Sequence, residues 1–187
     1  MSKALEYKTD RLTLRQWQWS DLKSFANMNA DRDVMRYFAS VGTAKGTEAS
    51  IQNWMIEIND RGWSNWAVEL TGSREFIGFV GITVPRRQLH FTPCVEIGWR
   101  LAKKFWHKGY ATEAAERVLE TGFVQFGLRE IVSFTSLINT PSRAVMERIG
   151  MKNTGEDFDH PALPNGSELQ RHCLYKIIHQ QWASNAA

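Results

Sequence analysis

A strand, a helix and a second strand follow one another between residues 95 and 137. Apolar side chains alternate over residues 94–101 and recur at helical spacing over 110–126, and a β-rich run covers 131–137. When a helix joins two strands of one sheet in this way, the strands are parallel and the connection is right-handed. The segment therefore predicts a parallel strand pair within a mixed α+β sheet.

Helices and antiparallel strands are expected in the rest of the chain. Helices should start at Ser20-Asp21, at Thr47-Glu48 and at Thr140-Pro141, with Thr140 as the N-cap and Pro141 in the first turn. A short helix over residues 33–37 and a loop over 38–46 should lie between the first two of these helices. Further strands are expected over residues 12–14, 66–70 and 76–84, from 151 onward, and over 169–178.

Length and charge exclude several classes of protein. A chain of 187 residues fits one domain, taken here as residues 1–187. The net charge is +3 and basic residues cluster only in pairs, so nucleic acid is not an expected partner. The two cysteines do not make a disulfide scaffold or a zinc site. Neither a signal peptide nor an apolar stretch of about 18 residues occurs, which predicts a soluble cytoplasmic protein.

The loop before residue 110 combines small residues with positive charge. Gly109 and Ala111 would leave the helix N-terminus open, and Lys103, Lys104 and Lys108 surround it. Free N–H groups and the helix dipole make such an end an anion site, and a diphosphate would suit it. Neither the Walker A nor the Rossmann glycine motif is present. Alternatively, Gly109 only eases a tight turn between strand and helix.

Three separated motifs resemble those of the GNAT N-acetyltransferases. Residues 106–111, WHKGYA, are similar to the family's acetyl-CoA signature (Q/R)-x-x-G-x-(G/A), although Trp106 replaces the first residue. Residues 9–15, TDRLTLR, resemble the start of the branch of ribosomal-protein alanine acetyltransferases, RimJ and RimL. Residues 139–151 resemble that branch's N-x-x-S…G-(F/M) pattern. The chain is thus identified as a member of the family, similar to that branch.

The resemblance implies a fold and a cofactor site. The fold would be a mixed, mostly antiparallel, twisted sheet of six to seven strands flanked by helices, with a splayed parallel pair that binds acetyl-CoA. No metal would be needed. The residues implied to bind acetyl-CoA comprise a strand end, the phosphate loop and the start of a later helix: Trp99, Arg100, Leu101, Trp106, His107, Lys108, Gly109, Tyr110, Ala111, Thr112, Asn139 and Ser142.

Acetyl transfer to an amine needs a group that takes the amine's proton. Glu96 occupies the position of a glutamate that some family members use, but it could equally be a structural carboxylate. His160, with Asp159, is the second candidate, because a histidine has the right pKa for a base at neutral pH. Many members of the family carry an acid tyrosine where this chain has Met146. Ser142 would replace it, unless it is only a helix-cap partner.

The acceptor is expected to be a primary amine. The resemblance favours the α-amine of a protein N-terminus, whose pKa of about 8 asks less of a base than a lysine at about 10.4. Asp157 and Asp159 would attract its ammonium form, with the loops over 38–46 and 157–167 bounding the cleft. A small amine such as a polyamine, amino acid or antibiotic is the alternative acceptor. A non-catalytic acyl-CoA-binding module is the alternative function. The chain could be a monomer or a homodimer.

Overall fold

A computed structural model describes residues 6–186 of the chain. The chain divides into two compact units, each built from separate stretches of sequence. The first unit runs up to Thr83 and includes Gly98–Val118, and the second comprises Val84–Ile97 and the residues from Leu119 onward. Strand β5 (Glu96–Leu101) and helix α3 (Tyr110–Glu120) each contribute residues to both units.

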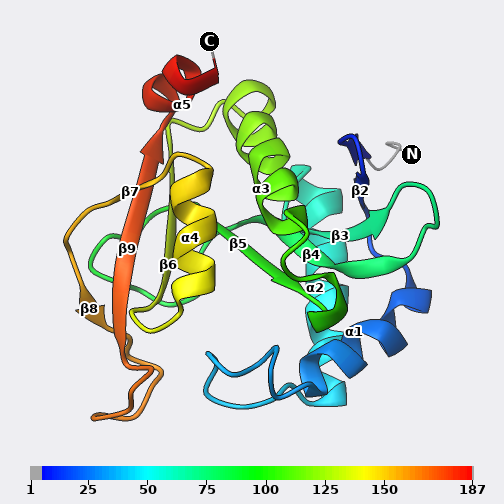
Figure 1. Ribbon diagram of the computed structural model, residues 1–187, viewed down its shortest axis with the longest axis horizontal. Helices are drawn as coiled ribbons and strands as arrows, with labels where there is room; N and C mark the ends of the chain where they lie inside the picture. Colours follow the sequence, from blue (N-terminus) through cyan, green and yellow to red (C-terminus); the bar gives the residue numbers. More distant parts are fainter. Residues whose placement is uncertain (1–5, 187) are drawn as a thin grey trace. The chain divides into compact units, whose positions relative to one another are not determined.

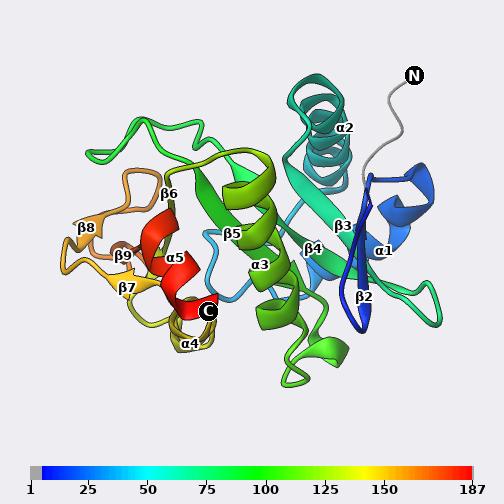
Figure 2. The ribbon, with the colours of Figure 1, turned by 90° about the horizontal axis from the view of Figure 1, so that it is seen from above.

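An antiparallel sheet forms the centre of the first unit. The strand order is β1-β2-β3-β4, and the later residues of β5 follow β4. Its strands are β1 (Tyr7–Lys8), β2 (Leu12–Arg15), β3 (Asn65–Leu70) and β4 (Phe76–Thr83). Helices α1 (Leu22–Ala30) and α2 (Ala44–Arg61) pack against each other and contact β4 and β3, respectively (Figure 2).

Close approach of β4 to β5 requires a glycine. The amide of Ala102 donates to the carbonyl oxygen of Ile77 at 2.9 Å, at the end of β5. A Cβ atom at Gly78 would lie 2.1 Å from the carbonyl oxygen of Arg100, and the φ of Gly78 is +147°. A larger residue would therefore push the two strands apart.

Aromatic rings fill the core of the first unit beside a buried charge cluster. The rings of Trp17, Phe25, Trp54, Phe76 and Phe79 contact one another. The indole N–H of Trp17 donates to a backbone oxygen of β3 at 2.7 Å. These contacts join the segment after β2 to α1, α2 and β4 in one core.

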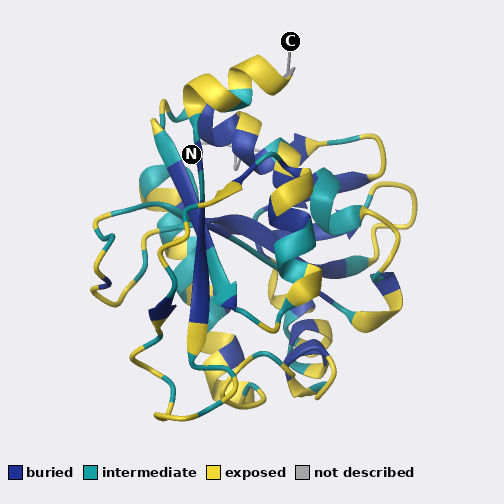
Figure 3. Cartoon of the chain, turned by 60° about the vertical axis from the view of Figure 1, so that its left-hand side comes forward, coloured by how far each residue is buried: buried dark blue, intermediate teal, exposed yellow. Residues whose placement is uncertain are grey.

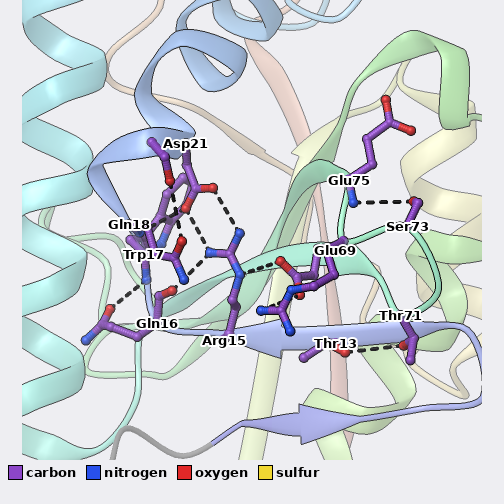
Figure 4. Close-up of polar contacts among 12 residues, drawn as sticks. Thr13, Arg15, Gln16, Trp17, Gln18, Asp21, Glu69, Thr71, Ser73 and Glu75 are labelled. Carbon is purple, nitrogen blue, oxygen red and sulfur yellow. Dashed lines mark hydrogen bonds and ion pairs between the residues drawn. The ribbon is translucent and has the colours of Figure 1, made fainter.

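The charge cluster is centred on Arg15 (Figure 4). Its guanidinium lies 2.8 Å from Asp21 and 2.6 Å from Glu69, and all three side chains are buried. Burial disfavours the charged guanidinium, but the hydrogen bonds and charges of the two carboxylates outweigh it and raise the pKa of Arg15. The cluster ties β2 to β3 and to the start of α1.

The second unit is built on strand β9 (Arg171–Ile178). Strand β6 (Glu130–Ser136) pairs with β9 in antiparallel register, and the short strands β7 (Lys152–Asn153) and β8 (Phe158–Asp159) also pair with β9. Helix α4 (Thr140–Arg148), yellow in Figure 1, contacts β6. Helix α5 (His179–Ala186) is largely exposed, whereas β9 is buried along most of its length (Figure 3).

The predicted parallel pair is present. Glu96 of β5 pairs with Val132 of β6 in parallel, and α3 connects the two strands. Nine strands occur within residues 6–186, of which β1, β7 and β8 have two residues each. The predicted α+β fold with a mixed, mostly antiparallel sheet is therefore confirmed. No helix in this part of the chain is both long and apolar enough to cross a membrane.

Three predicted helix features are wrong. Residues 33–37 form turns, because the Asp31 carboxylate accepts hydrogen bonds from the amides of Asp33 and Val34. Helix α2 begins at Ala44 instead of Thr47, with the Thr43 hydroxyl as its N-cap. The N-cap of α4 is Asn139, and Thr140 is the first residue of that helix. In each case a polar side chain one or more residues earlier accepts a hydrogen bond from a backbone amide and so sets the local structure.

Candidate active site

The loop before α3 has the backbone of an anion site. A 3₁₀ turn covers Lys103–Phe105, and α3 begins at Tyr110. The φ angles of His107 and Gly109 are +59° and +80°. The first helical hydrogen bond runs from the Glu113 amide to the Gly109 oxygen. The amides of residues 110–112 therefore have no partner within the helix and are available to an anion.

Two side chains fix the ends of this loop. The indole N–H of Trp106 donates to the carbonyl oxygen of Leu101 at 2.8 Å. The guanidinium of Arg11 donates to the carbonyl oxygen of Lys108 at 3.0 Å and lies over the Tyr110 ring, 4.6 Å from its centroid. The loop is thus attached to the end of β5 and, through Arg11, to the turn between β1 and β2.

Glu113 completes this attachment. Its carboxylate accepts hydrogen bonds from the Thr9 hydroxyl at 2.5 Å and from the Arg11 side chain at 2.7 Å. Burial disfavours its ionised form, but the hydrogen bonds from Thr9 and Arg11 prevail and lower its pKa. Arg11 lies within the TDRLTLR motif of residues 9–15, which gives it no role of its own. Contacts across 102 residues leave no local sequence signal.

Two of the three loop lysines have acidic partners. Lys103 pairs with Asp33 and Lys104 with Glu75, both within the first unit. These ion pairs are exposed, so each contributes little to stability and can be exchanged for another anion. The expected ring of three lysines around one anion is therefore not seen as such. The backbone geometry favours the amides of residues 110–112 as anion contacts.

Glu96 is half-buried on β5 and has an unusual pKa. Burial raises the pKa of its carboxyl to about 8. Its strand is held by neighbours of the second unit: the Val132 amide donates to the Val95 oxygen, and the Ser133 hydroxyl donates to the Ile97 oxygen, both at 2.9 Å. A carboxyl with this pKa is a far stronger base than an ordinary glutamate and can take a proton near neutral pH.

The two cysteine thiols, Cys94 and Cys173, are poor nucleophiles. Burial, followed by the charges of Glu96 and Glu130, raises the pKa of Cys94 to about 11. Cys173 is also a free thiol, and burial raises its pKa. Both cysteines are therefore protonated at neutral pH, and neither offers the thiolate that an acyl-cysteine would need.

His160 lies in an aromatic cluster of the second unit. Its ring is near those of Phe134 and Phe158, and its centroid is 4.8 Å from that of His172. Its Nδ1 accepts the Ala162 amide at 3.2 Å. Burial, followed by the charge of Arg87, lowers the pKa of His160. The imidazole is therefore neutral at pH 7 and able to accept a proton.

Asp159 does not share this environment. It is exposed at the end of β8 and forms an ion pair of 3.3 Å with Arg171, which is also exposed. Its neighbour Phe158 is 92% buried in a core cluster with Leu89, Val132 and Leu174. The structure therefore gives Asp159 a surface partner and Phe158 a packing role.

Asn139 and Ser142 lie together at the start of α4. The Asn139 side chain accepts the Ser142 amide at 3.3 Å and donates to the Thr135 hydroxyl at 2.8 Å. This cap uses the amide oxygen and one amide hydrogen of Asn139. Met146 is buried one turn further along, so it has a packing role. The Ser142 hydroxyl can donate a hydrogen bond from this helix start.

Comparison with known proteins places the chain in a family. Residues 11–152 match the model of the acetyltransferase (GNAT) domain. The match spans most of the chain, and the chain therefore belongs to the GNAT acetyltransferases. Members of this family use acetyl-CoA, so the chain is an acyltransferase with acetyl-CoA as its acetyl donor.

Individual relatives are also named as acetyltransferases or transacetylases, but their names do not give one common acceptor. The uncharacterized N-acetyltransferase YnaD of Bacillus subtilis is 28% identical, over 93% of this chain and 97% of the relative. The FsC-acetyl coenzyme A-N(2)-transacetylase of Aspergillus fumigatus is 27% identical, over 83% of this chain and 68% of the relative. A GNAT acetyltransferase structure from Bacillus anthracis superimposes with a TM-score of 0.78 at 30% identity, over 94% and 99% of the two chains.

Proposed function

We propose that the protein transfers an acetyl group from acetyl-CoA directly to a primary amine, in a ternary complex without an acyl-enzyme. The observation that carries this proposal is the helix N-terminus at residues 110–112, opened by Gly109 and attached through Arg11. Such an end suits the diphosphate of acetyl-CoA. The raised pKa of both cysteines supports direct transfer.

The cofactor site follows the family resemblance. The backbone of residues 99–101 would bind the pantetheine arm, as an added strand would. The amides of residues 107–112 and the Thr112 hydroxyl would bind the diphosphate. Asn139 would contact the pantetheine only with the part of its amide that its cap leaves free.

Glu96 is proposed as the base. Its carboxylate takes the proton of the amine while the amine nitrogen bonds to the thioester carbonyl carbon and the C–S bond breaks. Ser142 is proposed to donate a hydrogen bond to the departing thiolate, which is a fair leaving group with a thiol pKa of about 8.5. His160 is the second candidate for the base, because its imidazole is neutral.

The pKa of Glu96 favours an α-amine over a lysine side chain. An α-amine has a pKa of about 8, matched to a base at about 8, whereas a lysine amine at about 10.4 would give up its proton less readily. The leading acceptor is therefore the N-terminal α-amine of a protein, as the resemblance to ribosomal-protein alanine acetyltransferases suggests. The name of the Aspergillus relative, an N(2)-transacetylase, agrees with transfer to nitrogen, and a small amine is the second candidate.

Mass spectrometry of acetylated products, combined with an assay of CoA release, tests this proposal. The panel contains a peptide with a free N-terminus, the same peptide N-blocked with an internal lysine, a polyamine, free amino acids and a hydroxyl compound. The peptide with a free N-terminus is expected to be acetylated fastest. Reaction of small amines only would replace the protein-terminus acceptor, and reaction of the hydroxyl compound without any amine would overturn the N-acetyltransferase proposal.

Three further properties stay proposals. We propose that residues 1–187 form a single domain to which both compact units belong. A cytoplasmic location, where acetyl-CoA is at hand, and a monomer or homodimer also remain predictions. Sedimentation of the purified chain would decide its oligomeric state.

A further inference from the structure

Arg100 is a charged side chain held by neutral groups. Its Nη1 donates to the Asn29 side-chain oxygen at 2.7 Å. Its Cζ lies 4.2 Å from the centroid of the Phe38 ring and 5.4 Å from that of Phe79. All four residues belong to the first unit. The guanidinium is therefore fixed in place by an amide and two aromatic rings.

Asn29 is itself oriented by a second contact. It is 4% exposed, and its side-chain N–H donates to the Thr47 hydroxyl at 3.0 Å. The Thr47 hydroxyl in turn donates to the backbone oxygen of Thr43. This series of hydrogen bonds orients the Asn29 oxygen toward Arg100. The position of the guanidinium is therefore set by residues of α1 and α2.

No carboxylate within residues 6–186 pairs with Arg100 in the structure. Its Nε is buried and has no hydrogen-bond partner among the described residues. Burial lowers the pKa of Arg100 to about 10, so the side chain is still charged at pH 7. Arg15, in the same unit, is flanked by two carboxylates. An enclosed guanidinium without a counter-charge is unfavourable unless an anion completes it.

We propose that Arg100 binds a carboxylate of the acetyl acceptor, so that the acceptor is a primary amine that also carries a carboxylate. This inference rests on the proposed function and narrows its substrate class. Because Nη1 is bonded to Asn29 and Nε is buried, Nη2 is the donor left for a carboxylate oxygen. Phe38 belongs to the segment before α2 that is expected to bound the acceptor cleft. The carboxylate of an acceptor bound beside that segment could therefore contact the Arg100 guanidinium.

Matched acceptor pairs test the assignment in the full-length enzyme. Glycine, β-alanine and γ-aminobutyrate are compared with their amides in the CoA-release assay. The ratio of kcat/KM for acid over amide is measured for the parent, Arg100→Met, Arg100→Lys and Lys176→Met. Comparing this ratio between proteins cancels the different amine pKa values of acid and amide.

The ratio should fall about 10- to 100-fold in Arg100→Met for the acceptor of best-fitting length, because a bond between charged groups is lost. Arg100→Lys should keep part of the preference, since it retains the charge without the fork. Lys176→Met removes one exposed positive charge of the second unit and should leave the ratio at the parent value. A ratio unchanged in Arg100→Met would overturn the inference, as would a loss confined to acetyl-CoA affinity.

Direct binding separates this inference from the proposed function. Calorimetry with CoA present compares N-acetylglycine and N-acetyl-β-alanine with their amides, and needs no turnover. A preference for the acids that disappears in Arg100→Met supports the carboxylate site even if no amine is acetylated. Equal binding of acids and amides by the parent would refute it even if amines react.

The same variants identify the source of the carboxylate. The peptide amides Ala-Asp and Ala-Asn present an N-terminal amine with or without a nearby side-chain carboxylate. An Arg100-dependent preference for Ala-Asp together with poor use of free amino acids indicates an acidic protein N-terminus. The reverse pattern indicates a free amino acid, and both patterns support the carboxylate assignment.

Discussion

Arg11 Nη2 lies 2.6 Å from Glu113 Oε2, and this ion pair joins the turn between β1 and β2 to the first turn of α3. The same guanidinium bonds to the Lys108 oxygen, one residue before Gly109. The residue that holds the loop is thus remote from it in sequence. An exposed ion pair adds little to stability, so the main effect of this contact is expected on loop geometry.

Arg11→Met should weaken acetyl-CoA binding about tenfold, the equivalent of about 1.4 kcal/mol. The loop loses its bond to the Lys108 oxygen, and the amides of residues 110–112 are then less well ordered for a diphosphate. Isothermal calorimetry with acetyl-CoA measures the change. Lys176→Met serves as the control, because it removes one exposed basic residue from an ion pair in the second unit. Equal affinities for Arg11→Met and the parent would leave Arg11 without a positioning role.

Gly109→Asp should reduce acetyl-CoA affinity by at least about tenfold, because it places a carboxylate where an anion is expected to bind. It also strains the backbone, since the φ of Gly109 is +80°. Gly155→Asp is a matched control: its φ is +77°, and a Cβ there meets nothing within 4 Å. A similar loss of affinity in both folded variants would point to a general effect of strain and not to the phosphate site.

The local pattern of the chain was sufficient for the central part of the fold. The periodicity of residues 94–137 predicted β5, α3 and β6 and their parallel pairing, because each element follows its own hydrophobic spacing. Helix starts were harder to predict. Thr43 and Asn139 decide where α2 and α4 begin, and Asp31 favours turns after α1, each through side-chain bonds to nearby amides for which several polar residues compete.

The site was predictable only where a motif lies within one segment. Residues 106–112 were recognisable from Gly109 and its neighbours, whereas the attachment by Arg11 depends on a pairing across the fold. The contact of Arg100 with Asn29 spans 71 residues and follows no periodicity. The elevated pKa of Glu96 likewise reflects how much of the chain buries it, which alternation along one strand does not disclose.

Arg15→Met should destabilise the fold by about 3–5 kcal/mol, because it leaves the buried carboxylate of Asp21 without its cation and leaves that of Glu69 paired with the exposed Arg74. Urea unfolding followed by tryptophan fluorescence measures this change. Lys176→Met, which breaks an exposed pair with Glu130, should cost no more than about 1 kcal/mol. If Arg15→Met costs as little as the exposed pair, then water reaches the cluster or the carboxylates find other donors.

Glu96→Gln should stabilise the protein at alkaline pH relative to the parent. The pKa of Glu96 is raised from 4.5 to about 8, so its neutral form favours the folded state. Its contribution is fully present below about pH 4.5 and is lost as the pH rises to about 8. Glutamine does not titrate, so the unfolding free energy of the variant should exceed that of the parent increasingly between pH 5 and pH 8.5. Parallel stability curves over that range would show an ordinary carboxyl at residue 96.

Glu96→Gln should also lower kcat by about 10²–10⁴, with acetyl-CoA affinity retained, because it keeps the shape of the side chain and removes its basicity. In the parent, kcat should rise with pH and level off above about 8, as Glu96 loses its proton. The variant should lose this step in the pH profile of kcat. His160→Asn, measured in parallel, distinguishes the two candidate bases. If it abolishes activity while Glu96→Gln retains both full turnover and the parent's pH profile, the proton goes to His160, and Glu96 is a structural carboxyl of β5.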